Sequence, residues 1–160
     1  MRFATRQTGR RPSPSADVAR VTVDLPERFA FSTELALYAE HINYAQHLDN
    51  ARLLGLVSEA RVRWLASLKY QEGDVEGVGL IMADQSVRYA SEARAGEVMV
   101  VSMCAGEIGR VGFEVVWVMH EQASGREVAR GRHNMVCFDY ANARVRPVPD
   151  RARVRLAGAA

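Results

Sequence analysis

The sequence has 160 residues, of which 48% are hydrophobic, and this is enough for one globular domain with a buried core. It contains no uninterrupted apolar run of about 18 residues, which argues against a membrane-spanning helix and against a membrane partner. The formal charge of +2 is unevenly spread. Residues 1–20 and 141–160 each carry five arginines against one aspartate, so two basic ends flank an acidic centre.

The basic N-terminus has no long apolar stretch behind it, which fits a cytoplasmic protein better than a secreted one. Residues 1–20 lack periodicity and contain RRPSPS, so we expect a disordered basic segment there. We expect residues 21–150 to form the domain and residues 151–160 to form a basic C-terminal tail. Basic ends can attract nucleic acid, but residues 1–40 show no helix-turn-helix pattern, so we expect no nucleic-acid partner.

The first regular elements that the sequence predicts are strands. VTVDLPER, residues 21–28, reads as a short strand that Pro26 ends. FAFSTELALYA, residues 29–39, alternates with period two and places Phe31, Leu35 and Leu37 on one face. We therefore expect a half-buried strand just before the polar stretch HINYAQHLDN at residues 41–50.

The period then changes from two to that of a helix. In residues 49–70 the positions Leu54, Val57, Trp64 and Leu68 recur at helical spacing, which predicts one helix of roughly five turns. Asp49 or Asn50 is expected at the N-cap, because a short side-chain oxygen there can accept from the exposed N–H groups of the first turn.

Residues 77–140 read as four long strands separated by the turn signals ARAGE, GEIGR and ASGRE. The predicted order is thus a strand, one long helix and four more strands, an α+β fold with a five-stranded antiparallel sheet wrapped around the helix. One helix covers only one side of such a sheet, and long apolar edge strands invite pairing with a second copy. We therefore expect a homodimer or a homotetramer.

The polar stretch HINYAQHLDN allows three interpretations: a helix cap, a metal site or a catalytic site. Two histidines six residues apart, with no third histidine or cysteine at ligand spacing, argue against a metal, and we expect no metal or other cofactor. The two cysteines, Cys104 and Cys137, lie in apolar runs and are expected to be buried, reduced thiols.

The same stretch, at the start of the single long helix, resembles the hotdog-fold acyl-CoA thioesterases of the 4-hydroxybenzoyl-CoA thioesterase type. Their usual signature is an aspartate, three variable or small residues ending in glycine, a histidine, a hydrophobic residue and paired asparagines, followed on the helix by an E-A-R-like element. Here residues 43–50 read NYAQHLDN and residues 58–65 read SEARVRWL. The resemblance covers about residues 28–149 and implies a sheet wrapped around the helix, with two subunits sharing their active sites.

Two positions depart from the usual signature. Asn43 stands where the family has the aspartate that acts as base or nucleophile in many members, and Gln46 stands where it has the glycine. An asparagine accepts no proton at neutral pH, so a carboxylate elsewhere has to act as the base. The helix-bordering Glu59 is the first choice, because partial burial there would raise its pKa, and Asp49 is the second.

These considerations give a set of candidate site residues, each with a plainer alternative. The plainer roles are a turn residue for Asn43, a structural or capping role for His47, a helix cap for Asp49 and an ion pair with a neighbouring arginine for Glu59. Asn50 and Tyr44 are expected to bind substrate. The candidate catalytic residues are Asn43, His47, Asp49 and Glu59.

The resemblance implies an acyl-CoA thioesterase that releases a carboxylate and free coenzyme A through activated water. The unpaired N–H groups at the helix start would stabilise the developing oxyanion. The alternative is a hotdog domain that binds acyl-CoA without hydrolysing it, as a sensor or scaffold, and the replacement of the usual aspartate by Asn43 favours this reading.

Overall fold

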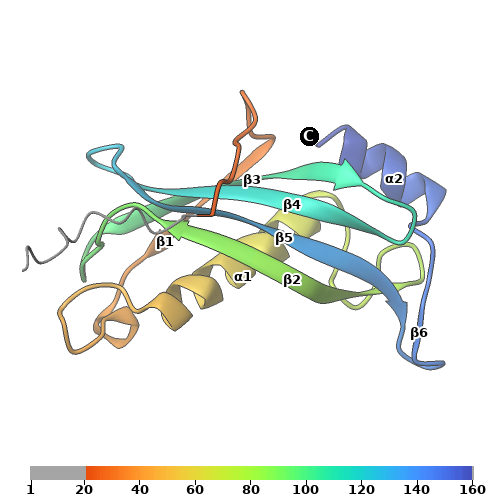
Figure 1. Cartoon of the computed structure of the whole chain (residues 1–160), viewed down its shortest axis with the longest axis horizontal. Helices are drawn as coiled ribbons and strands as arrows, with labels where there is room; N and C mark the ends of the chain where they lie inside the picture. The colour runs from red at the N-terminus through yellow and green to blue at the C-terminus, as the bar shows by residue number, and fades with distance from the viewer. Residues whose placement is uncertain (1–20, 160) are drawn as a thin grey trace, which may run out of the picture.

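The computed structural model describes residues 21–159, so the predicted disordered segment at 1–20 lies outside the described residues. One antiparallel sheet runs through the molecule, with the strand order β1-β3-β4-β5-β2 and the two-residue β6 attached to β5 (Figure 1). The strands are β1 (Phe31–Ala36), β2 (Gly79–Tyr89), β3 (Val98–Ile108), β4 (Gly112–Glu121), β5 (Glu127–Asp139) and β6 (Arg144–Val145). The helical elements are η1 (Ala39–His41), α1 (Asn50–Ser67) and α2 (Asp150–Ala157).

The predicted α+β architecture is confirmed, with β6 as an additional short strand. The helix α1 lies along one face of the sheet (Figure 1), and its 18 residues match the predicted five turns. The core forms between this helix and the inner face of the sheet. On α1 the buried apolar residues are Leu53, Leu56, Val57, Ala60, Trp64 and Leu65; those facing them on β3 and β4 include Met99, Val101, Val115, Trp117 and Met119.

The outer face of the sheet is covered in part by residues 21–29. Val23 is buried against Cys104 and Val116, and Leu25 and Phe29 pack around the same cluster. The strand predicted for residues 21–28 is wrong, because this segment is held by apolar side chains and does not join the sheet. The period-two pattern is the same for a strand and for an extended segment that rests on a sheet, so the sequence alone did not separate them.

The predicted basic tail at residues 151–160 is also wrong for most of its length. Residues 150–157 form the helix α2, which lies at one end of the sheet (Figure 1) and buries Ala152 and Leu156 completely. The helical spacing of these two residues gives α2 one apolar stripe. Packing of this stripe joins α2 to the domain, which therefore extends beyond residue 150.

Two of the three arginines of α2 donate to backbone carbonyl oxygens of other elements, and the third, Arg151, pairs with Glu76. Arg155 donates to the carbonyl oxygen of Leu68, the C-cap of α1, at 3.1 Å, and its guanidinium lies 5.2 Å from the centre of the Tyr70 ring. Arg153 donates to the carbonyl oxygens of Ile108 at 3.1 Å and Gly109 at 2.8 Å. The positive charge that suggested a solvated tail thus serves to attach α2 to the sheet and to α1.

Three polar side chains are buried beneath α1 without full hydrogen bonding. His133, on the inner face of β5, is completely buried, and neither of its ring nitrogens has a partner among the described residues. Nη1 of Arg61 and Nε1 of Trp64 are likewise unpaired there, although Nε of Arg61 donates to Glu72 at 2.7 Å. Burial, and secondly the charge of Arg61, lowers the pKa of His133 to about 3. This imidazole is therefore neutral in the folded protein at physiological pH.

Candidate functional site

A tight turn precedes α1 and presents the polar stretch. The bridge between Ile42 and Leu48 closes it, and within it the N–H of Gln46 donates to the carbonyl oxygen of Asn43 at 3.0 Å. The side-chain oxygen of Asn43 accepts from the N–H of Ala45 at 2.9 Å, which is the Asx-turn contact that favours asparagine at this position. The plainer reading of Asn43 as a turn residue is therefore confirmed, and the contact fixes the orientation of its amide.

Gln46 has the backbone conformation that normally selects glycine. Its φ of 66° lies in the left-handed region, where a Cβ atom crowds the backbone. The family signature has glycine at this position, and the turn geometry supplies the physical reason. This chain keeps the turn with a glutamine and accepts the steric cost.

We predict that Gln46→Gly stabilises the protein. Removing the Cβ relieves a strain of about 1 kcal/mol, and the greater freedom of glycine in the unfolded chain offsets part of that gain. The free energy of unfolding in urea should rise by a few tenths of a kcal/mol to about 1 kcal/mol. Gln46→Ala is the matched control, because it removes the same polar group but keeps the Cβ. An equal effect of both variants would contradict the strain argument.

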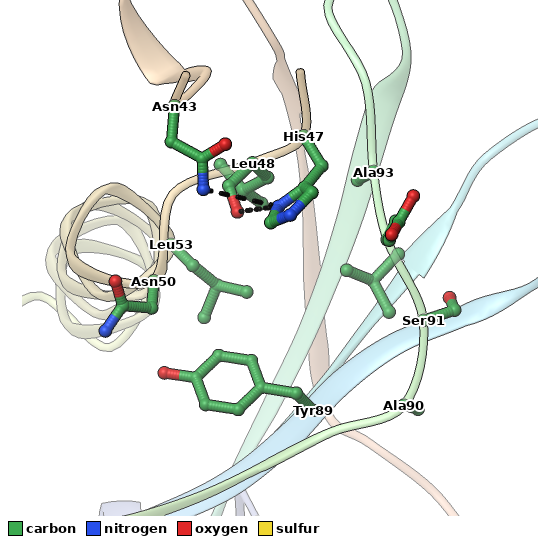
Figure 2. Close-up of a pocket in the computed structure, with 11 residues that line it drawn as sticks. Asn43, His47, Leu48, Asn50, Leu53, Tyr89, Ala90, Ser91 and Ala93 are labelled. Atoms are coloured by element: carbon green, nitrogen blue, oxygen red, sulfur yellow. Dashed lines mark hydrogen bonds between the residues drawn. The ribbon is translucent and has the colours of Figure 1, made fainter. Parts of the chain in front are cut away.

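His47 follows the turn and lies against the Asn43 amide. Its Nδ1 is 3.4 Å from Nδ2 of Asn43 and 3.4 Å from the carbonyl oxygen of Leu48 (Figure 2). The side chain is half-buried, and the backbone oxygen of His47 accepts from the N–H of Asn43 at 2.9 Å. The structure thus brings together two of the predicted catalytic residues.

Asp49 caps α1, as predicted. Its Oδ1 accepts from the N–H groups of Ala51 at 2.9 Å and Arg52 at 3.3 Å, and its carbonyl oxygen accepts from the N–H of Leu53 at 2.8 Å. Within residues 21–159 the N–H of Asn50 has no acceptor, and Oδ2 of Asp49 has no donor. The first turn of α1 therefore keeps one free backbone donor at its positive end.

A cavity of about 470 Å³ opens between this helix start and the end of β2 (Figure 2). Its size is in the range of small-molecule sites. Tyr89 extends from the end of β2 with its hydroxyl directed towards the Asn50 side of the cavity. Burial, and secondly the negative charge of Asp49, raises the pKa of Tyr89, so this phenol is protonated at neutral pH and can donate a hydrogen bond. The lining residues are Asn43, His47, Leu48, Asn50, Leu53, Tyr89, Ala90, Ser91, Glu92, Ala93 and Val128.

The loop from residue 90 to residue 97 forms the opposite wall and is held by Arg126. Nη1 of Arg126 donates to Oγ of Ser91 at 2.8 Å and to the carbonyl oxygen of Glu92, and Nη2 donates to Glu97 at 3.0 Å. The carbonyl oxygen of Ala93 in this loop accepts from the N–H of Leu48 at 2.7 Å. Both walls of the cavity are thereby fixed to each other through the backbone.

Three candidate residues lie outside the cavity lining: Asp49, which caps the neighbouring helix start, and also Tyr44 and Glu59. Tyr44 is at the tip of the turn and is 98% exposed. Glu59 pairs with Arg63 at 2.8 Å and its side chain is 49% exposed, so the partial burial expected for it is wrong. Arg63 also donates to Oγ1 of Thr33 in β1, which places this pair on the flank of α1 that faces β1. The ion-pair alternative for Glu59 is confirmed, and its assignment as the base stays a prediction.

Sequence reasoning missed the cavity residues that come from the end of β2. Tyr89, Ser91 and Glu92 are 39 or more positions beyond Asn50, and only the packing of β2 beside the start of α1 brings them to the same cavity. Glu92 is the only carboxylate among the described lining residues, and it pairs with Arg94 at 3.3 Å. The strand pattern of residues 77–140 does not indicate that β2 ends beside the helix start.

The cysteines have the environment expected of them. Cys104 and Cys137 are both unpaired and buried. Burial raises the pKa of each thiol, to about 11 for Cys137, so neither is a ready nucleophile. Among residues 21–159, no three histidine, cysteine, aspartate or glutamate side chains are grouped so as to hold a metal ion. The helices of the same part of the chain are too short or too polar to cross a bilayer.

Comparisons with known proteins agree with this geometry. Residues 38–156 match the profile of the thioesterase-like superfamily. No curated protein is similar enough in sequence to match the chain. Solved structures of hotdog-fold thioesterases do match, with TM-scores that show a shared fold, and the predicted hotdog architecture is confirmed.

Three of these structures have the same TM-score of 0.72. The 1,4-dihydroxy-2-naphthoyl-CoA thioesterase from Synechocystis is 18% identical, and the match covers 79% of this chain and 95% of that chain. A thioesterase from Thermus thermophilus, complexed with coenzyme A and zinc, is 21% identical, with 83% and 96% covered. A predicted thioesterase from Bacillus stearothermophilus is 20% identical, with 81% and 95% covered.

Proposed function

The chain belongs to the thioesterase-like superfamily, and from this premise we propose that it hydrolyses an acyl-CoA thioester to a carboxylate and free coenzyme A. The observation that carries the proposal is the cavity at the start of α1, which combines a free backbone donor with the side chains of His47 and Tyr89. A thioester carbonyl needs donors where its negative charge grows, and each such donor contributes about 3 kcal/mol to the transition state.

In the proposed reaction the thioester carbonyl lies at the Asn50 N–H, with His47 beside it. A water molecule attacks the carbonyl carbon and gives its proton to a carboxylate. The tetrahedral intermediate then expels the coenzyme A thiolate, which takes up that proton to leave as the thiol. Asn50 binds the substrate through its backbone, whereas Tyr44 is placed to contact only parts of a ligand that extend out of the cavity.

Asp49 is our choice for the carboxylate that activates water. It is half-buried directly before Asn50, one of its oxygens is free of the cap contacts, and its charge acts on Tyr89 inside the cavity. Glu92 lines the cavity but is more exposed and pairs with Arg94, and Glu59 faces β1.

The test is thiol release from a panel of acyl-CoA esters, measured on the wild type and on three matched variants. Asp49→Asn keeps the capping oxygen and removes only the charge, so it should lower kcat at least 100-fold without changing the melting temperature. Glu92→Gln and Glu59→Gln should each change kcat/KM less than about threefold. Loss of activity in Glu92→Gln or in Glu59→Gln instead would move the base to that residue. Saturable acyl-CoA binding without thiol release from any ester would favour the non-catalytic alternative.

We also propose that two copies pair through β2. This strand is an edge of the sheet, it is 11 residues long, and most of it is exposed, which is the kind of edge that natural monomers usually protect. Met82 and Tyr89 on this strand are large apolar side chains that are exposed in the single chain. Because Tyr89 lines the cavity, a partner strand on β2 lies close to the site.

The proposed dimer predicts a specific effect of charge on β2. Met82→Asp should shift the mass measured by size exclusion with light scattering from dimer to monomer, because a carboxylate at the seam loses its hydration on pairing. Val154→Asp on α2 is the control, since Val154 is 73% exposed and lies outside β2, so the mass should be unchanged. A wild type that is monomeric at micromolar concentration would contradict the proposal.

The buried, unpaired thiols of Cys104 and Cys137 are consistent with a reducing compartment, and we place the protein in the cytoplasm on that ground. The assignment is tested by fractionation of cells that express the full chain.

A further inference from the structure

The contacts of His47 bear on which of its two ring nitrogens carries the proton. Only a bare Nδ1 can accept a hydrogen bond, and only a protonated Nδ1 can donate one. The two groups within 3.4 Å of Nδ1 make opposite demands, because the Asn43 amide nitrogen is a donor and the Leu48 carbonyl oxygen is an acceptor. One of them sets the tautomer.

The orientation of the Asn43 amide is not free. Its oxygen accepts from the N–H of Ala45 at 2.9 Å, and this contact closes the Asx turn. Turning the amide over would break that bond and set an NH2 group against a backbone N–H. The group that faces His47 is therefore the amide nitrogen, and it carries hydrogen atoms that need an acceptor.

We propose that Asn43 is a positioning residue that holds His47 in the Nε2–H tautomer, so that His47 presents a hydrogen-bond donor to the substrate. This inference rests on the proposed function, in which the thioester carbonyl lies in the cavity that His47 lines. It also gives a physical reason for the departure at position 43. An aspartate there would accept from Nδ1–H and leave Nε2 without a proton, whereas asparagine favours the opposite tautomer.

The polar residues of the site then have separate roles in the proposed reaction. His47 and the Asn50 N–H both donate to the growing oxyanion, and neither takes the proton of the attacking water. That proton goes to a carboxylate, which is consistent with the separate base required by the proposed reaction. A site with aspartate at position 43 and one with asparagine would thus hold the same histidine in opposite tautomers.

The tautomer is measured directly by long-range 1H–15N correlation of the histidine rings in the full chain without substrate, since protonated and bare ring nitrogens differ strongly in chemical shift. The His47 ring is assigned as the signal missing in His47→Gln, at a pH where it is neutral. We expect the Nε2–H tautomer to dominate in the wild type. In Asn43→Ala only the Leu48 carbonyl faces Nδ1, and in Asn43→Asp an added carboxylate does, so both should change the major tautomer to Nδ1–H.

Tyr44→Ala is the matched control, because Tyr44 lies in the same turn, is 98% exposed and makes no hydrogen bond with the His47 ring. It should leave the tautomer unchanged. A wild type with mainly Nδ1–H, or an Asn43→Ala variant that keeps Nε2–H, overturns the inference. Thioesterase activity with the Nδ1–H tautomer would refute this inference alone, and the expected tautomers without thiol release would refute the proposed function alone.

Discussion

Replacing His47 by glutamine lowers kcat/KM for acyl-CoA hydrolysis by about 100-fold, because one donor to the oxyanion is lost from its position in the cavity. Glutamine also has an NH2 group that can donate. It lacks the imidazole nitrogen that contacts the Asn43 amide, so its flexible side chain is not held in position in the cavity. The loss should appear mainly in kcat, since the donor is needed most when the carbonyl becomes an oxyanion.

His41 provides the matched control for this substitution. It is in the same polar stretch and is half-buried like His47, but its Nδ1 accepts from the N–H of Tyr38 at 3.0 Å and it does not line the cavity. His41→Gln replaces the same ring by the same amide and keeps an oxygen that can accept from Tyr38. We expect it to change kcat/KM less than about threefold. Equal losses in both variants would mean that the polar stretch acts through stability and not through a donor at His47.

The features of the site that were predictable from sequence are the local ones. The change of hydrophobic period at Asp49 marks the start of α1, and the cap follows from a single side chain and the two N–H groups next to it. The turn at residues 43–46 is equally local, since its contacts span no more than four positions. Such features depend on neighbours along the chain, so a pattern of a few residues is enough to identify them.

The position of Glu59 shows what the pattern could not supply. Helical spacing places it at the border of the apolar face, which is compatible with either flank of α1. The flank is decided by Arg63, which pairs with Glu59 and also contacts Thr33, a residue 30 positions earlier. The same is true of Tyr89, which reaches the cavity only because β2 is the edge strand next to the start of α1. These placements depend on the topology of the sheet, which no local period encodes.

The C-terminal residues were misread for a different reason. Their charge pattern dominated the interpretation, and only two apolar residues, Ala152 and Leu156, form the buried stripe of α2. Both are fully buried. Arg153 and Arg155 donate to backbone carbonyl oxygens, whereas Arg144 and Arg146 pair with Asp139 and Arg151 pairs with Glu76. In the folded chain some of these arginines bind backbone carbonyl oxygens. Any residue can supply a carbonyl oxygen, so no pattern of residues in the sequence indicates these contacts.

His133 gives the stability of the protein a defined dependence on pH. Its pKa is lowered to about 3 in the folded state by burial and by the charge of Arg61, whereas it has its ordinary value near 6.5 in the unfolded chain. Below pH 6.5 the unfolded state binds a proton that the folded state excludes. The stabilisation that comes from the neutral His133 is thus complete above pH 6.5. As the pH falls towards 3, the free energy of unfolding decreases by about 1.4 kcal/mol per pH unit.

Two substitutions separate this titration from the cost of the unpaired ring nitrogens. Between pH 7 and pH 5 the free energy of unfolding of the wild type should fall by about 2 kcal/mol more than that of His133→Leu or His133→Gln, since neither side chain titrates. At pH 7 only His133→Leu should match or exceed the wild type in stability, because glutamine leaves buried polar atoms without partners and leucine does not. Urea unfolding of the three proteins at both pH values measures both effects. Parallel losses in all three proteins would mean that the imidazole is not excluded from protonation, and that a water or another group reaches it beneath α1.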